Sequence, residues 1–254
     1  MRADVQLPLG LLFGFVAVLA RVSGALIFVP LPGLRQAPAV ARIVLAVSLT
    51  LALSPLWPNV TAEPTIGRAL VLVASESVLG VTIGLAVGFL METLMVAAQI
   101  FGMQAGYSYA STINPSTDAD SNVLLVVAEL MGGLLFFALG LDREVIRVFA
   151  ASLAAHPPGA FALKASSGRA MISLGSGMLA TGMQLAMPLV ALLMLVDVAL
   201  ALLGRMHQQL QLITLAFPIK MLATLAFLAA ILTLFLPVYR AAAERTFSAL
   251  ARII

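Results

Sequence analysis

Residues 69–98 read ALVLVASESVLGVTIGLAVGFLMETLMVAA, an apolar stretch in which Glu76 and Glu92 are the only charged side chains. A helix that crosses the hydrocarbon core of a bilayer needs about 20 apolar residues. This stretch is longer than that, so a helix over it must tilt, bend or project beyond the lipid. The stretch therefore predicts a long membrane helix.

The rest of the chain has the same character. Of its 254 residues, 62% are hydrophobic and 10% are charged, whereas soluble domains average about 45–50% apolar and 25% charged. This composition excludes a soluble enzyme and a disordered chain. The net charge of +3 is dispersed through a hydrophobic chain, so no basic surface for nucleic acid is expected. Without cysteine, the chain has no disulfide and no cysteine-ligated metal.

Apolar segments recur along the whole chain, and Pro188 and Pro218 lie inside the last two of them. A proline inside a helix removes a backbone hydrogen bond and kinks the helix. Because no Pro-rich or Ser-rich linker divides the chain, we expect one domain over residues 1–254. The fold class predicted is an all-α integral membrane protein with about six hydrophobic helices, several of them kinked. The six segments are about 9–29, 39–57, 69–98, 123–141, 171–203 and 210–237.

The distribution of Lys and Arg predicts an orientation for these segments. Positive side chains are more frequent in the loops that would be cytoplasmic if the N-terminus were inside, which favours both termini inside. Residues 101–122 carry carboxylates but no Lys or Arg, and they would then lie on the outer side. The first apolar run follows Arg2 and resembles a signal peptide, but Asp4 and the apolar continuation past Arg21 favour an uncleaved helix.

Three glycines, Gly80, Gly84 and Gly88, recur at every fourth position within 69–98. Small residues at this spacing allow another backbone to approach closely. The sequence therefore predicts a helix-packing seam at these glycines. The partner is either a helix of another subunit or a helix of the same chain.

Ionisable side chains within the apolar segments are costly and mark candidate functional groups. They would form either a proton or ion path, or neutralising pairs and groups that reach the membrane surface. Because nothing in the sequence brings these groups together, we favour the second interpretation. Arg21 could pair with any of the four acidic groups. The residues are Arg21, Glu76, Glu92, Glu129, Asp197 and Lys220.

The most unusual part of the chain is residues 99–122. It concentrates glycines, amides, hydroxyls and two of the three tyrosines between two apolar segments. Backbone of this kind at membrane depth needs water or protein partners. We therefore expect a re-entrant or plug-like segment rather than a simple outer turn.

Motifs typical of enzymes are absent from the sequence. There is no phosphate loop of the G-x-x-x-x-G-K type and no H-E-x-x-H motif. The two histidines, His156 and His207, are expected in loops rather than as metal ligands. We predict no catalytic, cofactor-binding or metal-binding residues.

Several stretches together resemble one known family. They are Arg21–Gly24 with Pro30, Gly33, Pro38 and Arg42; Glu76 with Gly80 and Gly84; Gln99–Gly106 with Asn114 and Pro115; Ala151–Ser152; Pro157–Gly159; Ala186–Pro188; Leu203–Arg205; and Ala216–Lys220. Their order and spacing resemble the export-gate family of type III secretion, the FliR family of flagella and its virulence counterparts (SctT-like). The resemblance covers about residues 10–240. The chain departs from the family's usual pattern at Gly140–Asp142 and at Gln208–Gln211, which leaves flagellar and virulence systems both open.

The resemblance implies a non-enzymatic pore subunit without a cofactor. In this family one copy joins several FliP-like and FliQ-like subunits in an inclined helical cone around a central pore. An FlhB-like switch protein surrounds the cytoplasmic side. The N-terminal part of the chain would be FliP-like and the C-terminal part FliQ-like. The expected location is the bacterial inner membrane, in the flagellar basal body, and the transient partners are unfolded flagellar export substrates.

The plug of the closed pore in this family matches about residues 106–122 here. Bulky Tyr and Ile side chains would seal a narrow bore, while glycine and proline would shape the backbone. A small-molecule or ion transporter is the alternative from another class, suggested by kinked helices and buried acids, but the chain shows no obvious pair of matched halves. The plug residues implied are Gly106, Tyr107, Tyr109, Ile113, Asn114 and Pro115.

Overall fold

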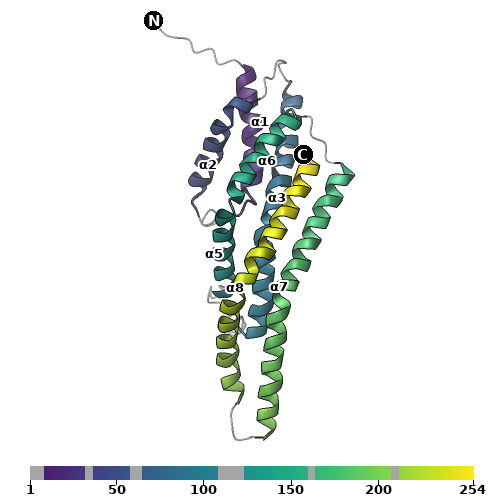
Figure 1. The fold of residues 1–254 in the computed structure, drawn as a ribbon. Helices are drawn as coiled ribbons and strands as arrows, with labels where there is room; N and C mark the ends of the chain where they lie inside the picture. The colour runs from purple at the N-terminus through teal and green to yellow at the C-terminus, as the bar shows by residue number, and fades with distance from the viewer. Residues whose placement is uncertain (1–8, 32–36, 58–64, 108–122, 160–163, 207–211) are drawn as a thin grey trace. The chain divides into compact units, whose positions relative to one another are not determined.

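The computed structural model describes residues 9–31, 37–57, 65–107, 123–159, 164–206 and 212–254. All regular structure in these ranges is helical (Figure 1), as the sequence predicts. The elements are α1 Leu9–Leu26, α2 Ala39–Ala52, the short 3-10 helix η1 Ser54–Leu56, α3 Ile66–Ala105, α5 Val123–Ala138, α6 Leu141–Ala155, α7 Ala165–Met206 and α8 Leu212–Ile253.

Among the residues that the structure describes, two helices, α3 and α7, are long and apolar enough to cross a membrane. The number rises to four if α5 with α6, and the two parts of α8, each form one span. The predicted class, an all-α membrane protein with several bent helices, is confirmed, and within the described residues two to four helices rather than six have the length and apolar character of a span. The first two segments fold as α1 and α2, which are apolar but shorter than a simple span. Proline limits α2, because Pro38 is its N-cap and Pro55 lies in η1 directly after it.

Helix α6 lies where the sequence indicated a loop. Its buried side chains recur at intervals of four, at Leu141, Val145, Phe149 and Leu153. Charged side chains separate them, so this amphipathic helix does not stand out in a search for long apolar runs. The sixth apolar segment also continues further than expected, because α8 extends to Ile253 and contains both Pro218 and Pro237.

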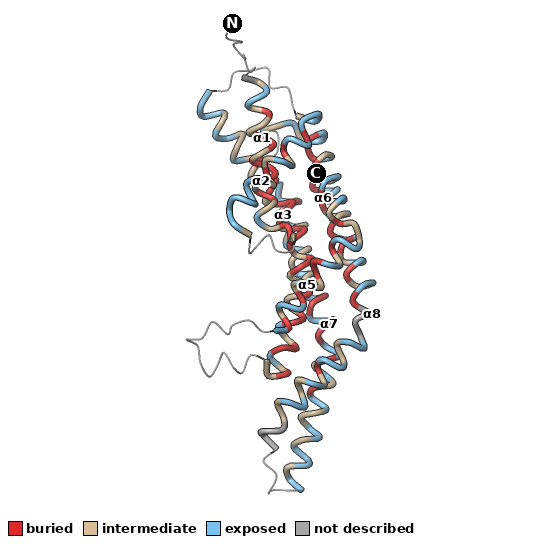
Figure 2. The backbone as a smooth tube through the Cα atoms, turned by 90° about the vertical axis from the view of Figure 1, so that its left-hand side faces the viewer, coloured by how far each residue is buried: buried red, intermediate tan, exposed pale blue. Residues whose placement is uncertain are grey.

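The chain packs as two compact units. Unit 1 comprises Met1–Phe89, Phe136–Gly175 and Ala243–Ile254, and unit 2 comprises Leu90–Leu135 and Ser176–Ala242. Each unit has its own buried residues, at which the backbone tube of Figure 2 is coloured red.

In unit 1 the core lies between α1 and the first part of α3. Val18 and Val22 of α1 and Leu79 and Ile83 of α3 are fully buried. At the end of η1, the ring of Trp57 packs edge-to-face on Phe15 of α1, with ring centroids 5.5 Å apart. These contacts bury apolar surface that would otherwise face solvent or lipid.

In unit 2 the core is formed by α3, α5 and α7, with α8 packed against it. Phe101, Leu124 and Leu189 are central members, and Phe227 of α8 packs against them. By contrast, much of α7 is exposed, as the pale blue stretches of Figure 2 show, and many of its exposed residues are apolar. The exposed large side chains of unit 2 on this helix include Leu179, Met183, Met187, Met194, Leu195, Val198, Leu202, Leu203 and Met206.

Candidate functional site

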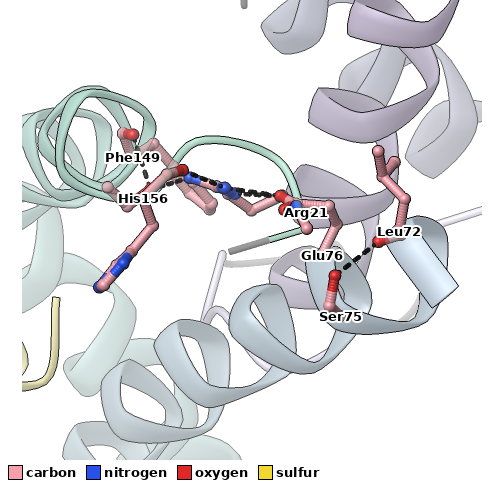
Figure 3. A network of polar contacts seen from close by, with 8 residues as sticks. Arg21, Leu72, Ser75, Glu76, Phe149 and His156 are labelled. Carbon is pink, nitrogen blue, oxygen red and sulfur yellow. Dashed lines mark hydrogen bonds and ion pairs between the residues drawn. The ribbon is translucent and has the colours of Figure 1, made fainter. Parts of the chain in front are cut away.

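A buried ion pair joins α1 and α3 in unit 1. The Nε and Nη2 atoms of Arg21 each lie 2.6 Å from Oε2 of Glu76. Both side chains are 0% exposed. Figure 3 shows the two side chains pointing toward each other from their helices. Of the four acidic groups that the sequence offered to Arg21, the fold therefore brings Glu76 to it.

The same pair also binds the C-terminal end of α6. Arg21 Nη1 donates a hydrogen bond to Ser152 Oγ at 3.0 Å, and Nη2 donates to the carbonyl oxygen of His156 at 3.1 Å. His156 is the C-cap of α6, where the helix dipole favours a positive charge. On the other side, the amide of Gly159 donates to Glu76 Oε1 at 3.0 Å. Arg21 and Glu76 thus connect α1, α3 and α6 (Figure 3).

The opposite charges of Arg21 and Glu76 neutralise each other in this network. Both charged groups also have other hydrogen-bond partners. Sequence reasoning did not assign a role to Ser152, His156 or Gly159 in this contact. A signal for them existed, since Ala151–Ser152 and Pro157–Gly159 are two of the stretches that carry the family resemblance.

Two of the predicted seam glycines, Gly80 and Gly84, face the backbone of α1, and Gly88 faces Phe28 just after that helix. A Cβ atom at Gly80 would lie 2.0 Å from the carbonyl oxygen of Arg21, and one at Gly84 would lie 2.3 Å from that of Ala25. At Gly88 the distance to the carbonyl oxygen of Phe28 would be 2.9 Å. All three distances are shorter than a van der Waals contact, and those at Gly80 and Gly84 are far shorter. The structure therefore shows these glycines packed on α1 and the residues that follow it in the same chain.

A second polar cluster connects α3, α7 and α8 in unit 2. Lys220 Nζ lies 2.5 Å from Oδ1 of Asp197, and Gln104 Nε2 donates a hydrogen bond to Oδ2 of Asp197 at 3.2 Å. The side chains of Lys220 and Asp197 are 16% and 41% exposed, so this pair is more accessible than Arg21–Glu76. The fold thus brings together two more of the predicted ionisable residues.

The end of α3 lies against α8 in the same unit. Gly106 has a φ of 86°, and a Cβ atom there would lie 2.6 Å from Cδ1 of Phe217. The hydroxyl of Tyr107 donates a hydrogen bond to the carbonyl oxygen of Met221 at 3.2 Å. Gly106 and Tyr107 are the first of the predicted plug residues, and both contact the helix that contains Lys220.

Glu92 and Glu129 are partly buried in α3 and α5. Tyr109, Ile113, Asn114, Pro115 and His207 lie outside the described residues. In the part of the chain that the structure describes, no three His, Asp or Glu side chains group in a way that could hold a metal ion.

Residues 12–246 match the family described as bacterial export proteins, family 1. The chain belongs to this family. Relatives in this family resemble the chain over most of its length. The flagellar biosynthetic protein FliR of Escherichia coli K12 is 28% identical over 237 residues, which are 93% of this chain and 89% of the relative. The proteins of the same name from Pectobacterium carotovorum and Caulobacter vibrioides are 26% and 28% identical, over 94% and 84% of this chain and 90% and 85% of the relatives.

The family match confirms the resemblance drawn from the sequence, and it includes every residue of both polar clusters. Membership of an export family, together with helices long and apolar enough to cross a membrane, supports a membrane location for the chain. The relatives also support a role as a component of an export apparatus.

Proposed function

We propose that this chain is a core subunit of the type III protein export gate in the bacterial inner membrane, at the flagellar basal body. It joins FliP-like and FliQ-like subunits and an FlhB-like switch protein around a pore, and unfolded flagellar subunits pass through that pore. The chain performs no catalysis in this role, and both compact units act as one export-gate domain.

The observation that carries this proposal is the family match over residues 12–246. Three relatives of similar length are all named as flagellar biosynthetic proteins, which favours a flagellar over a virulence system. The exposed apolar side chains of α7, such as Met187, Leu195 and Leu202, agree with a subunit that packs against other membrane proteins. Large exposed apolar surfaces mark protein or membrane contacts.

The segment after Tyr107 is proposed to close the pore when no substrate passes. Its support is chemical: Tyr109 and Ile113 are bulky, Asn114 and Pro115 shape the backbone, and no Lys or Arg lies in residues 108–122. A gate must exclude ions yet yield to a peptide. Adaptable side chains without a charged ring meet both requirements.

The test is deletion of residues 108–116, which leaves Tyr107 in place. The partner subunits should still co-purify with the variant, whereas inner-membrane vesicles containing it should become permeable to small ions. The conductance of vesicles with the unaltered chain is the control. Unchanged conductance in vesicles that contain fully assembled variant complexes would contradict the proposed plug.

A further inference from the structure

The charged side chains of the described residues are divided unequally between the two compact units. In unit 2 the Lys and Arg residues equal the Asp and Glu residues, with three of each. In unit 1 the Lys and Arg residues outnumber the Asp and Glu residues by nine to four. The surplus of positive charge therefore belongs to unit 1.

Four exposed basic side chains lie toward one end of unit 1, which we call the basic end. This end holds the start of α3, the start of α7 and the end of α8 (Figure 1). Glu244 and Arg245 of α8 are exposed as well, and their charges offset each other. The basic end is therefore positively charged. Its four basic residues are Arg68, Lys164, Arg169 and Arg252.

Exposed apolar side chains accompany two of these arginines. Val71 follows Arg68 by three positions in α3, and Ile172 follows Arg169 by three positions in α7. Residues three apart lie on the same face of a helix. Val71 and Ile172 are 67% and 74% exposed. On one face, each of these helices thus presents a positive group beside apolar surface.

This combination matches the two parts of a phospholipid. Arg68 and Arg169 stand just before the apolar stretches 69–98 and 171–203, in the two helices long and apolar enough to cross a membrane. The headgroups of a bilayer lie at the edge of its hydrocarbon core, and basic side chains near that edge attract anionic headgroups. An acidic protein segment would complement the charge but would leave the apolar side chains uncovered.

We propose that the basic end of unit 1 binds anionic phospholipids. Its four basic side chains contact the headgroups, while Val71 and Ile172 contact the upper parts of the acyl chains. This inference goes beyond the proposed export role, because it concerns the lipid around the chain rather than the proteins that pass through the pore.

The test is lipid binding to the full chain, purified in mild detergent with its co-eluting partners and followed by native mass spectrometry. Dioleoylphosphatidylglycerol should bind more tightly than dioleoylphosphatidylcholine, because the two lipids share their acyl chains and differ in net headgroup charge. One basic group near an anionic surface changes the affinity about fivefold. Arg169→Gln should therefore lower the affinity for phosphatidylglycerol by about that factor, whereas Arg169→Lys should retain it.

Two further variants separate the charged and apolar contributions. Arg205→Gln is the matched control, because Arg205 is also exposed but lies in the last turn of α7, at the other end of that helix. This control should leave the affinity for phosphatidylglycerol unchanged. Ile172→Ser should weaken the binding of both lipids, since it removes an apolar contact without changing the charge.

Three results would overturn the proposal. The first is equal affinity of the unaltered chain for the two lipids, and the second is an equal effect of Arg169→Gln and Arg205→Gln. In the third, Arg169→Gln keeps its lipid affinity but loses a co-eluting protein, which would assign the basic end to an acidic protein partner. Deletion of residues 108–116 tests the export role separately, so failure of the lipid site is distinguishable from failure of that role.

Discussion

At the scale of single residues, Arg21 and Glu76 form a fully buried ion pair. A buried charge without its partner is strongly unfavourable, whereas an apolar pair in the same place is often tolerated. The guanidinium of Arg21 also donates to Ser152 and to the carbonyl of His156. Its contribution is therefore structural, since it fixes three helices of unit 1 at one point.

Glu76→Gln should lower the stability of unit 1 by about 3–5 kcal/mol, because it leaves Arg21 charged and buried. The measurement is the thermal unfolding of the purified complex in mild detergent. Replacing both residues, as Arg21→Met with Glu76→Leu, should cost less than Glu76→Gln alone. Arg147→Ala is the control, because Arg147 pairs with Glu144 at an exposed site and should change little. An equal loss in Arg147→Ala would contradict a special role for the buried pair.

Gly84→Ala should destabilise the contact between α1 and α3 by about 1–3 kcal/mol, the usual range for overpacking. The added methyl group would meet the backbone of Ala25, which cannot turn away as a side chain does. Gly168→Ala is the matched control on α7, where an added Cβ meets nothing within 4 Å. The measurement is the melting temperature of each variant, which should fall for Gly84→Ala and not for Gly168→Ala. Similar melting temperatures would show that the close packing of Gly84 is unimportant for stability.

At the scale of elements, the sequence predicts the long helices well and the short ones poorly. The apolar runs that became α3 and α7 are longer than any strand or turn, so their helical state follows from composition and length. The limits of α2 follow from Pro38 and Pro55. That the helix is too short to span a membrane was evident only from the structure. Helix α6 was missed because its mean polarity resembles that of a loop, although its apolar positions have helical spacing.

Ser152→Ala should loosen the C-terminal turn of α6. The change leaves Arg21 Nη1 without an acceptor, at a cost of about 1–3 kcal/mol. Amide hydrogen exchange of residues 150–156 should therefore become faster. Ser248→Ala is the control, because Ser152 and Ser248 each donate a hydrogen bond to the carbonyl oxygen three residues earlier, of Phe149 and Arg245, but Ser248 is exposed. Equal exchange rates in α6 for both variants would argue that Ser152 does not hold this helix end.

At the scale of the whole molecule, the sequence indicated which charges matter but not how they pair. Arg21 and Glu76 are 55 positions apart, and Gln104 and Asp197 are 93 apart. Spacing within one helix says nothing about such contacts, since they depend on how separate helices pack. The glycines behaved likewise: their spacing predicted a close helix contact, while the identity of the partner helix, α1, came from the fold.

The central claim is that this chain acts within a hetero-oligomeric export gate, and purification in mild detergent tests it most directly. A tagged chain co-expressed with its FliP-like and FliQ-like neighbours should elute as a large complex that contains all three proteins. The mass of that complex, measured by native mass spectrometry, should correspond to one copy of this chain with several copies of each partner. A stable monomer or homodimer that excludes both partners would contradict the account and favour a transporter.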